Sequence, residues 1–439
     1  MSQVIPEGWK LFSIDDFLDF SSLFCDGDWV ESKDQDPEGG NRLIQLADIG
    51  DGIFLDKSNK YLNDKQFRRL NCTELKEGDI LIARMPDPLG RACLFPGLGG
   101  GCATVVDVAI LRSPTADKHW LMYMINSHVI RRQIESLSAG TTRTRISRKL
   151  FCRVLFPTPS ISAQKRIADI LRAIDRAIAH TEALIEKYQQ IKAGLMHDLF
   201  TRGIGADGKL RPPRDEAPEL YQESAIGWIP KDWVVNLITS CADVIDPNPS
   251  HRNPIYHDEG FPFISTVEFD EFDQIQLDTS RRVIEEIVLE QERRCKLSKS
   301  SIAFSRKGTI GETRILPSHL RFALLDSLCV INPVNINPSF LFYLLRSHFL
   351  KIQIRNMTMG QALPQMSIGR VRELLIPVPQ LADEQEKIES KLNSIDEYIF
   401  RNGRCLQKLR VKKSGLMHDL LTGKVPVKVH SDEVDHISN

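Results

Sequence analysis

Hydrophobic and polar positions follow two different rhythms along the chain. In two stretches, short apolar runs such as Ile80–Ala83 alternate with clusters of turn residues. In two others, proline is absent and apolar residues recur in alternating steps of three and four. The first rhythm is typical of small α+β globules, and the second of long helices with one apolar seam. The predicted order is a globule at 1–158, a long helix at 159–201, a linker at 202–226, a second globule at 227–379, a second long helix at 380–422 and a tail at 423–439.

The second half of the sequence repeats the first at an offset of 220 to 224 residues. Ile5-Pro6-x-x-Trp9 returns as Ile229-Pro230-x-x-Trp233, and the segment GLMHDL at 194–199 returns letter for letter at 415–420. Six consecutive identities at an offset already set by earlier matches indicate a duplicated unit. We therefore expect two globules related by pseudo-symmetry, each followed by a helix.

Each predicted helix carries one seam of apolar residues. In the first helix it comprises Ile167, Ile170, Ile174, Ala177, Thr181, Leu184, Tyr188, Ile191 and Leu195, and in the second Ile388, Leu392, Ile395, Ile399, Leu406, Leu409 and Leu416. An isolated helix cannot bury such a seam, whereas two related seams in one chain can cover each other in an antiparallel coiled coil. That pairing would place one globule near each end of the helices. The alternative is that each helix packs on its own globule.

Some seam residues and the histidines of GLMHDL are candidates for the helix pairing and for docking partner subunits. His197-Asp198 and His418-Asp419 point in different directions on a helix and cannot chelate a metal together, so a structural or docking role is favoured. The candidates are Ile167, Ile174, Leu184, Tyr188, Leu195, His197, Ile388, Ile395, Leu409, Leu416 and His418. Gly194 and Gly415, inside the same repeated segments, suggest close backbone approach or a helix break.

Composition narrows the class of protein. Basic and acidic residues number 57 and 58, and 42% of the residues are hydrophobic, which excludes collagen-like, disordered and strongly polycationic classes. The nine cysteines include no C-x-x-C pair, so neither a disulfide framework nor a thiolate zinc site is indicated. Without a signal-like or membrane-spanning stretch, the expected location is the cytoplasm.

Three segments resemble catalytic motifs but lack features that those motifs require. The glycine cluster 97–101 has no helix start after it, as a nucleotide or S-adenosylmethionine loop requires, and favours a hairpin loop. Pro86-Asp87 lacks the downstream Asp/Glu-x-Lys of a metal-dependent nuclease. Asp246-Pro247-Asn248-Pro249 has the wrong order for an amino-methyltransferase loop and lacks its aromatic residue. We therefore predict no catalytic site and no metal site.

Positive charge is concentrated in one segment. Residues 131–153 contain seven basic residues and one acidic residue, and the matching segment 351–373 contains four and one. Arginine with hydroxyl groups on a loop suits phosphates and base edges, and glutamine suits adenine. A merely solvated charged face is the alternative. The candidate DNA-binding residues are Arg84, Thr141, Thr142, Arg143, Thr144, Arg145, Ser147, Arg148 and Lys149 in the first repeat, and Arg306, Lys307, Thr309, Thr358, Gln361, Gln365, Ser367 and Arg370 in the second.

At this point the chain resembles the DNA-specificity subunits of type I restriction-modification systems. The resemblance rests on the Ile-Pro-x-x-Trp openings, the Gly140…Ser147 and Gly360…Ser367 loops, the helices that contain Gln164 and Gln385, the repeated GLMHDL and the linker GKLRPPRDEAPELYQESAIGWIPKDW. It implies two target-recognition domains joined by conserved helices that form an antiparallel coiled coil. It also implies a bipartite, asymmetric double-stranded DNA site, one half read by each domain, with the coil setting the spacer.

The resemblance further implies a subunit without catalytic activity or cofactor of its own. Two modification subunits would supply adenine methylation with S-adenosylmethionine, and restriction subunits would supply ATP-driven translocation and cleavage with Mg²⁺. The runner-up interpretation is a DNA methyltransferase or nuclease with integral recognition domains. A third is an assembly scaffold that does not read DNA.

Overall fold

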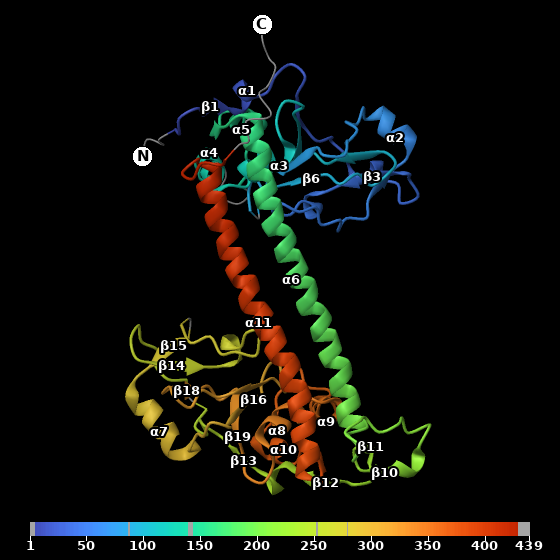
Figure 1. Cartoon of the computed structure of the whole chain (residues 1–439), viewed down its shortest axis with the longest axis vertical. Coiled ribbons are helices and arrows are strands. Elements are labelled where there is room, and N and C mark those ends of the chain that lie inside the picture. The colour runs from blue at the N-terminus through green and yellow to red at the C-terminus, as the bar shows by residue number, and fades with distance from the viewer. Residues whose placement is uncertain (1–4, 87, 139–143, 252, 279, 429–439) are drawn as a thin grey trace. The chain divides into compact units, whose positions relative to one another are not determined.

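The chain divides into two compact units. The computed structural model describes residues 5–428 except 87, 139–143, 252 and 279 (Figure 1). Unit 1 comprises residues 1–180 and 406–439, and unit 2 comprises residues 181–405. Each unit therefore contains one globule together with one part of each long helix.

The globule of unit 1 is built on three small sheets. Its four-stranded sheet has the antiparallel order β2-β8-β5-β6, its three-stranded sheet the order β4-β3-β7, and β1 pairs with β9. The strands are β1 (Lys10–Ser13), β2 (Leu23–Asp26), β3 (Asn41–Ile44), β4 (Tyr61–Leu62), β5 (Ile80–Ala83), β6 (Ala92–Leu94), β7 (Cys102–Thr104), β8 (Val108–Arg112) and β9 (Leu155–Thr158). The helices are α1 (Ile14–Phe17), α2 (Asp64–Arg69), α3 (Lys118–Ile125), α4 (His128–Leu137) and α5 (Arg148–Phe151).

The globule of unit 2 repeats this topology strand for strand. Its sheets have the orders β13-β19-β16-β17 and β15-β14-β18, and β12 pairs with β20. The strands are β12 (Trp233–Leu237), β13 (Ala242–Ile245), β14 (Phe261–Ile264), β15 (Arg281–Val283), β16 (Ile302–Ser305), β17 (Thr313–Ile315), β18 (Ala323–Leu324), β19 (Leu328–Pro333) and β20 (Leu375–Pro379). The helices are α7 (Glu285–Cys295), α8 (Pro338–Leu344), α9 (His348–Thr358) and α10 (Ile368–Arg372). The α+β duplication predicted from the sequence is confirmed.

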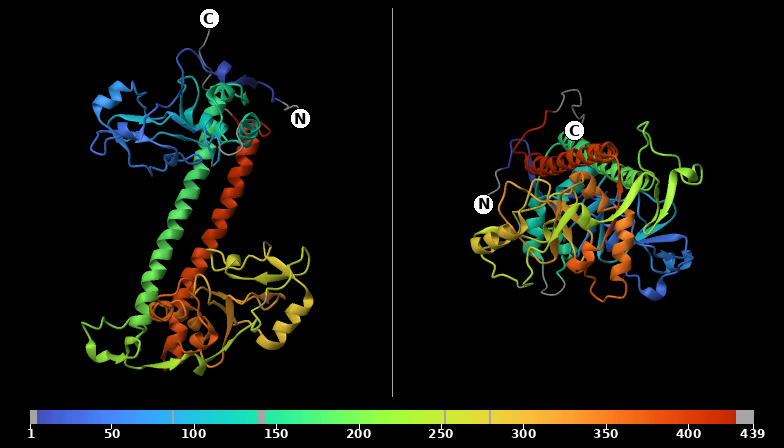
Figure 2. Two further views of the ribbon diagram at one scale, coloured as in Figure 1. Left: turned by 180° about the vertical axis from the view of Figure 1, so that it is seen from behind. Right: turned by 90° about the horizontal axis from the view of Figure 1, so that it is seen from below.

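The long helices are α6 (Ile161–Thr201) and α11 (Ala382–Leu421). In unit 1, Ile167 and Leu171 near the start of α6 share a buried cluster with Leu420 and Leu421 at the end of α11. In unit 2, the end of α6 and the start of α11 share another cluster, which contains Leu199, Phe200, Ile388 and Leu392. Within each unit the helices therefore run antiparallel and side by side (Figures 1 and 2). Both clusters also contain globule residues, so the helices pack on each other and on the globules together.

The predicted seam of α6 is half right. The positions that recur every seven residues from Ile167 are correct, because Ile167, Ile174 and Thr181 are buried. The intervening positions are wrong by one residue: Ile185 is 7% exposed, whereas Ile191 is 43% exposed. The second line runs instead through the buried Leu171, Ile185 and Leu199, with Ile178 and Lys192 half-buried between them. In α11, the predicted burial of Ile388, Leu392, Ile399 and Leu406 is confirmed.

Two expectations about glycine are wrong. A Cβ at Gly194 or Gly415 would meet nothing within 4 Å inside the described chain, so no close backbone approach occurs there. Both glycines also lie within continuous helix, seven and six residues before the ends at Thr201 and Leu421. The glycine cluster 97–101 is not a hairpin loop, because β6 before it and β7 after it belong to different sheets.

The segment between the repeats contains more structure than a plain linker. A hairpin forms between β10 (Tyr221–Ser224) and β11 (Gly227–Pro230). Before it, the guanidinium of Arg211 donates to both carboxylate oxygens of Glu384 at 2.6 and 3.0 Å. The indole of Trp233 donates to the same carboxylate at 3.1 Å. These buried contacts hold the segment against the first turn of α11.

Candidate nucleic-acid interface

In unit 2, six of the predicted DNA-binding residues lie around one surface hollow. It has a volume of about 550 Å³, and two further residues, His251 and Met366, complete its lining. The six come from two places, the residues just after β16 and the segment formed by the α9–α10 loop and α10: Arg306, Lys307, Gln361, Gln365, Ser367 and Arg370. Sequence positions about 60 residues apart thus form one polar, positively charged surface.

Backbone hydrogen bonds hold the two segments together. Lys307 forms an isolated antiparallel bridge with Gln365, and the Met366 amide donates to the Arg306 carbonyl at 2.8 Å. The Gln365 amide donates to the side-chain oxygen of Gln361 at 2.8 Å, which fixes the loop conformation. Ser367 begins α10, because its hydroxyl accepts a hydrogen bond from the Arg370 amide at 3.2 Å. The loop is therefore shaped by its own contacts before any ligand arrives.

Acidic residues beneath the hollow compensate part of its positive charge. The ammonium group of Lys307 lies 2.5 Å from Asp326, and the Nδ1 atom of His251 lies 3.1 Å from the same oxygen. Arg306 is 4% exposed and lies 3.6 Å from the carboxylate of Asp246. Arg306 is thus a buried, paired residue, whereas Gln365 and Arg370 are exposed.

Unit 1 has the matching arrangement at the end of β5. The Ile146 amide donates to the Arg84 carbonyl at 3.2 Å, as Met366 does to Arg306. Arg84 is 3% exposed, and its guanidinium lies 3.0 Å from Asp26. Burial lowers the pKa of Arg84, and the neighbouring Asp26 opposes that effect. Arg145, which is exposed, pairs with Asp107 at 2.9 Å.

The remaining DNA-binding candidates of unit 1 lie in the segment 141–149. Ser147 begins α5 by accepting a hydrogen bond from the Leu150 amide at 3.3 Å. Arg148 donates to the Phe24 carbonyl at 3.0 Å, and Lys149 is exposed. Thr144 is half-buried. Thr141, Thr142 and Arg143 lie outside the described residues.

Two candidates of unit 2 do not line the hollow. Thr309 is exposed in the loop between β16 and β17. Thr358 is the last residue of α9, and its hydroxyl donates back to the Ile354 carbonyl at 2.8 Å. That hydroxyl is therefore already used within the helix.

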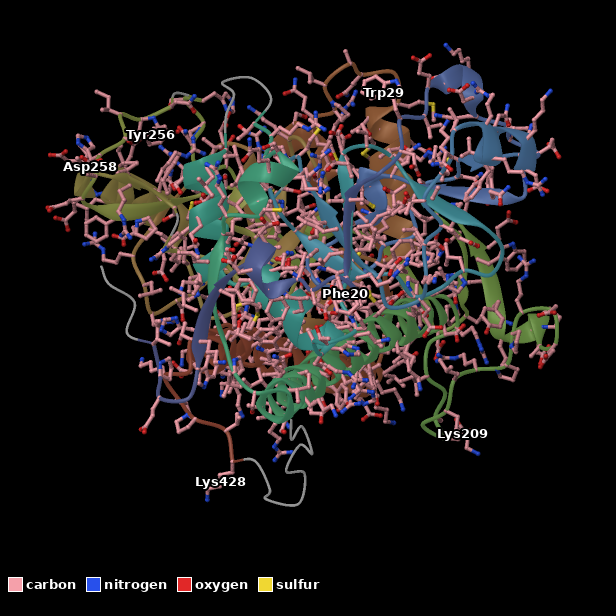
Figure 3. The ribbon with its side chains drawn as sticks, turned by 90° about the horizontal axis from the view of Figure 1, so that it is seen from above. Phe20, Trp29, Lys209, Tyr256, Asp258 and Lys428 are labelled. Atoms are coloured by element: carbon pink, nitrogen blue, oxygen red, sulfur yellow. The ribbon has the colours of Figure 1, made fainter. Side chains whose placement is uncertain are left out.

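The acidic and histidine partners of these basic residues were not predicted from the sequence. Asp26 and Asp246 lie at the repeat offset, so a comparison of the two halves could have found them. No comparable signal marks Asp326 or His251. The loop that carries His251 also carries Tyr256, labelled in Figure 3, whose ring lies 4.8 Å from the guanidinium carbon of Arg281.

The histidines of the repeated GLMHDL segments each contact a globule. In unit 2, the rings of His197 and His348 have centroids 5.2 Å apart. In unit 1, Nδ1 of His418 lies 3.3 Å from Nε2 of His128. Burial lowers the pKa of His128 and of His348, and the neighbouring histidine lowers it further. Each pair joins the last turns of a long helix to the first residue of α4 or α9.

The described residues lack two kinds of feature. They contain no group of three or more His, Cys, Asp or Glu side chains placed to hold a metal ion. None of the described helices combines the length and the apolar character needed to cross a membrane.

Comparison with known proteins identifies the family. The profile of the type I restriction modification DNA specificity domain matches residues 6–190 and again residues 230–408. The type I restriction enzyme MjaVIII specificity subunit of Methanocaldococcus jannaschii is 24% identical over 448 residues, which cover 97% of this chain and 94% of that protein. The putative type I restriction enzyme MjaX specificity subunit of the same organism is 24% identical over 435 residues, covering 97% and 95%.

Two solved structures share the fold of this chain. The type I restriction-modification S subunit from M. genitalium aligns with a TM-score of 0.55 at 16% identity, covering 96% of this chain and 97% of that one. A chain from a study of complex assembly and conformational transition of the type I R-M system aligns with a TM-score of 0.53 at 16% identity, covering 96% and 100%. Because the family profile matches both repeats, the chain belongs to the type I restriction-modification DNA-specificity family and carries two specificity domains.

Proposed function

We propose that this chain is the sequence-reading subunit of a type I restriction-modification complex and binds a bipartite, asymmetric site in double-stranded DNA. One observation carries the proposal: the two globules share a topology, yet present different side chains from the same loop. Unit 1 offers Arg145 there, with Arg148 at the start of α5, and unit 2 offers Gln361 and Gln365. Arginine pairs best with guanine and glutamine with adenine, so the two halves of the site should differ in sequence.

The chain's partners follow from this role. Its net charge of −1 is low for a protein that holds DNA alone, because phosphate neutralisation supplies most nonspecific affinity. We infer that two modification subunits share the duplex and that restriction subunits join them. S-adenosylmethionine, ATP and Mg²⁺ would bind to those subunits. The two histidines and the half-buried seam positions, including Leu184, Tyr188, Leu195, Ile395, Leu409 and Leu416, are the proposed sites for helix pairing and subunit docking. All nine cysteines are free, which fits a cytoplasmic location.

A globule exchange tests the reading role. Residues 1–158 are replaced by the corresponding globule of a homologous specificity subunit, and the chimera is expressed with the modification subunits in a host whose methylome is then sequenced. We expect one half of the methylated motif to change and the other half to stay, because each globule contacts only its own half-site. A motif altered in both halves, or in neither, contradicts the proposal.

A binding assay separates the catalytic alternative. If the chain were itself a methyltransferase, the purified chain alone would bind S-adenosylmethionine with a measurable Kd by calorimetry. We expect no binding by the chain alone and binding by its complex with the modification subunits. Binding by the chain alone would favour the alternative.

A further inference from the structure

The two units contain the same three-residue network, formed by a tyrosine, an aspartate and a lysine. In unit 1, the hydroxyl of Tyr123 on α3 donates to Oδ2 of Asp175 on α6 at 2.6 Å. Oδ1 of that aspartate lies 2.7 Å from the ammonium group of Lys413 on α11, which also lies 6.0 Å from the centre of the Tyr123 ring. A single carboxylate thus joins a globule helix to both long helices.

In unit 2, the same network forms with the long helices exchanged. Tyr343 on α8 donates to Oδ2 of Asp396 on α11 at 2.7 Å, and Oδ1 lies 2.6 Å from Lys192 on α6. Lys192 lies 5.6 Å from the centre of the Tyr343 ring. The first network takes its aspartate from α6 and its lysine from α11, and the second does the reverse. Asn393 also accepts from Tyr343, at 2.7 Å.

These charges are more protected than ordinary surface ion pairs. The side chains of Lys192 and Asp396 are 14% and 25% exposed, and those of Lys413 and Asp175 are 26% and 32% exposed. By contrast, Arg401 and Glu397, paired one turn apart on α11, are 76% and 68% exposed. Partial burial strengthens a charge interaction and makes an unpaired partner costly. Burial and the neighbouring aspartate also raise the pKa of both tyrosines, so their hydroxyls remain donors.

The two networks together define one register of the helix pair. Opposed residues of an antiparallel pair have numbers with a constant sum, and the pairs 175/413 and 192/396 have the same sum. A slip by one heptad in either direction would leave one lysine opposite an acid and the other opposite a small apolar or glycine position. The residues facing Lys413 and Lys192 would be Glu182 and Gly403 after one slip, and Ala168 and Glu389 after the other. Of these three registers, only the observed one places an aspartate of the opposite helix beside both lysines.

We propose that Asp175 with Lys413, and Asp396 with Lys192, are positioning residues that fix the register of α6 against α11 and so select the spacer length, while Tyr123 and Tyr343 tie each globule to that register. This inference rests on the proposed function. The apolar seam cannot do this alone, because a heptad slip again brings seam residues against seam residues. The charged pairs distinguish the observed register from the slipped ones, as polar groups do in other coiled coils.

The test compares adjacent residues on α11. The complex of the full chain with its modification subunits is titrated with duplexes that carry the methylated motif with its native spacer, or with one base pair more or less. Asp396→Asn should reduce the preference for the native spacer by roughly three- to tenfold, the range of one coupled pair. The bases preferred in each half-site should not change. Glu397→Gln, which removes the exposed pair with Arg401, should leave the preference intact.

A charge exchange separates register from general stability. Asp175→Lys should weaken spacer preference, and combining it with Lys413→Asp should restore at least half of the lost preference, since the pair is reformed with its ends reversed. If Asp396→Asn does not fold, Tyr343→Phe, which removes one hydroxyl, and the charge-exchange pair still decide the question. An unchanged spacer profile in Asp396→Asn, or no rescue in the exchange, overturns the inference. A wild-type complex without any spacer preference would instead refute the proposed function.

Discussion

Arg84 and Arg306 support the loops proposed to contact DNA, although neither side chain is exposed on the surface of its loop. Both follow a central strand, and both are nearly fully buried. Each lies near an aspartate at the end of the edge strand on the far side of one intervening strand, Asp26 in β2 or Asp246 just after β13. Their carbonyl groups receive the loop amides of Ile146 and Met366. Removing either guanidinium would take the nearest cation away from a partly exposed carboxylate and remove a buried side chain beside the loop. We therefore expect these arginines to hold the loops in shape while exposed loop residues meet the DNA.

Gly403 lies where the second globule presses on α11. A Cβ at this position would come within 2.5 Å of the Phe272 ring. Gly403→Ala should therefore lower the free energy of unfolding by about 1 to 2 kcal/mol, because the clash exceeds the helix-propensity gain of alanine. Gly415→Ala is the control on the same helix, since nothing lies within 4 Å of its Cβ, and it should raise stability by up to about 1 kcal/mol. Urea titrations of both variants measure the difference, and equal signs would contradict the packing described.

Asp273 should make the stability of unit 2 depend on pH under acidic conditions. Burial alone would raise the pKa of Asp273, but hydrogen bonds and charge from Arg346, with Lys192 and Arg314 nearby, lower it to about 2. Arg346 donates to both of its oxygens at 2.7 Å. Because the folded pKa lies below the ordinary value of 3.8, the ionised group stabilises the fold fully above about pH 4, and this stabilisation is lost as the pH falls toward 2.

Asp273→Asn should consequently cost about 2 kcal/mol at pH 7, and the gap from wild type should close as the pH falls from 4 to 2. Thermal unfolding at several pH values measures this gap. Asp258→Asn, at an exposed position labelled in Figure 3, is the control and should follow wild type throughout. A gap that stays constant down to pH 2 would show that Asp273 does not titrate as described.

At the scale of elements, the sequence predicted the long helices and their pairing better than their register. Proline-free stretches and a heptad rhythm are strong signals, and both helices lie where they were expected. The seam of α6 was displaced because Ile170, Leu184 and Ile191 are as apolar as the buried Leu171 and Ile185. Periodicity alone cannot choose between two adjacent apolar stripes. The choice depends on the charged partners that the opposite helix and the globule supply.

The candidate interface was predictable only in part. Residues that follow a strand or lie in a basic loop, such as Lys307 and Gln365, could be selected from the sequence one segment at a time. These residues come together because the backbone of Lys307, just after β16, pairs with that of Gln365 in the loop before α10. The two residues are far apart in the chain, so no local pattern predicts the pairing. Burial of Arg306 and the presence of His251 in the hollow follow from the sheet packing, and no local pattern encodes them.

For the molecule as a whole, duplication explains how a single chain can read an asymmetric site. The repeats preserve the sheets, the long helices, the histidine pairs and the tyrosine-aspartate-lysine networks. They differ in the loops that surround Arg84 and Arg306 and in the contacts of Phe272 with Gly403 and of Asp273 with Arg346. The shared parts fix geometry, while the variable parts are free to change base preference. Recognition and spacing should therefore be separable by mutation.

Insertion of one heptad into both helices tests that separation. Seven residues placed between 180 and 181 of α6 and between 405 and 406 of α11 preserve both networks and the seam rhythm, and lengthen each helix by roughly 10 Å. At about 3.4 Å per base pair, the preferred spacer should widen by roughly three base pairs with both half-sites unchanged. Insertion into one helix alone should instead destabilise the chain, because one seam then lacks its partner. Methylome sequencing and thermal unfolding measure the two results, and an unwidened spacer after the double insertion would show that the helices do not set it.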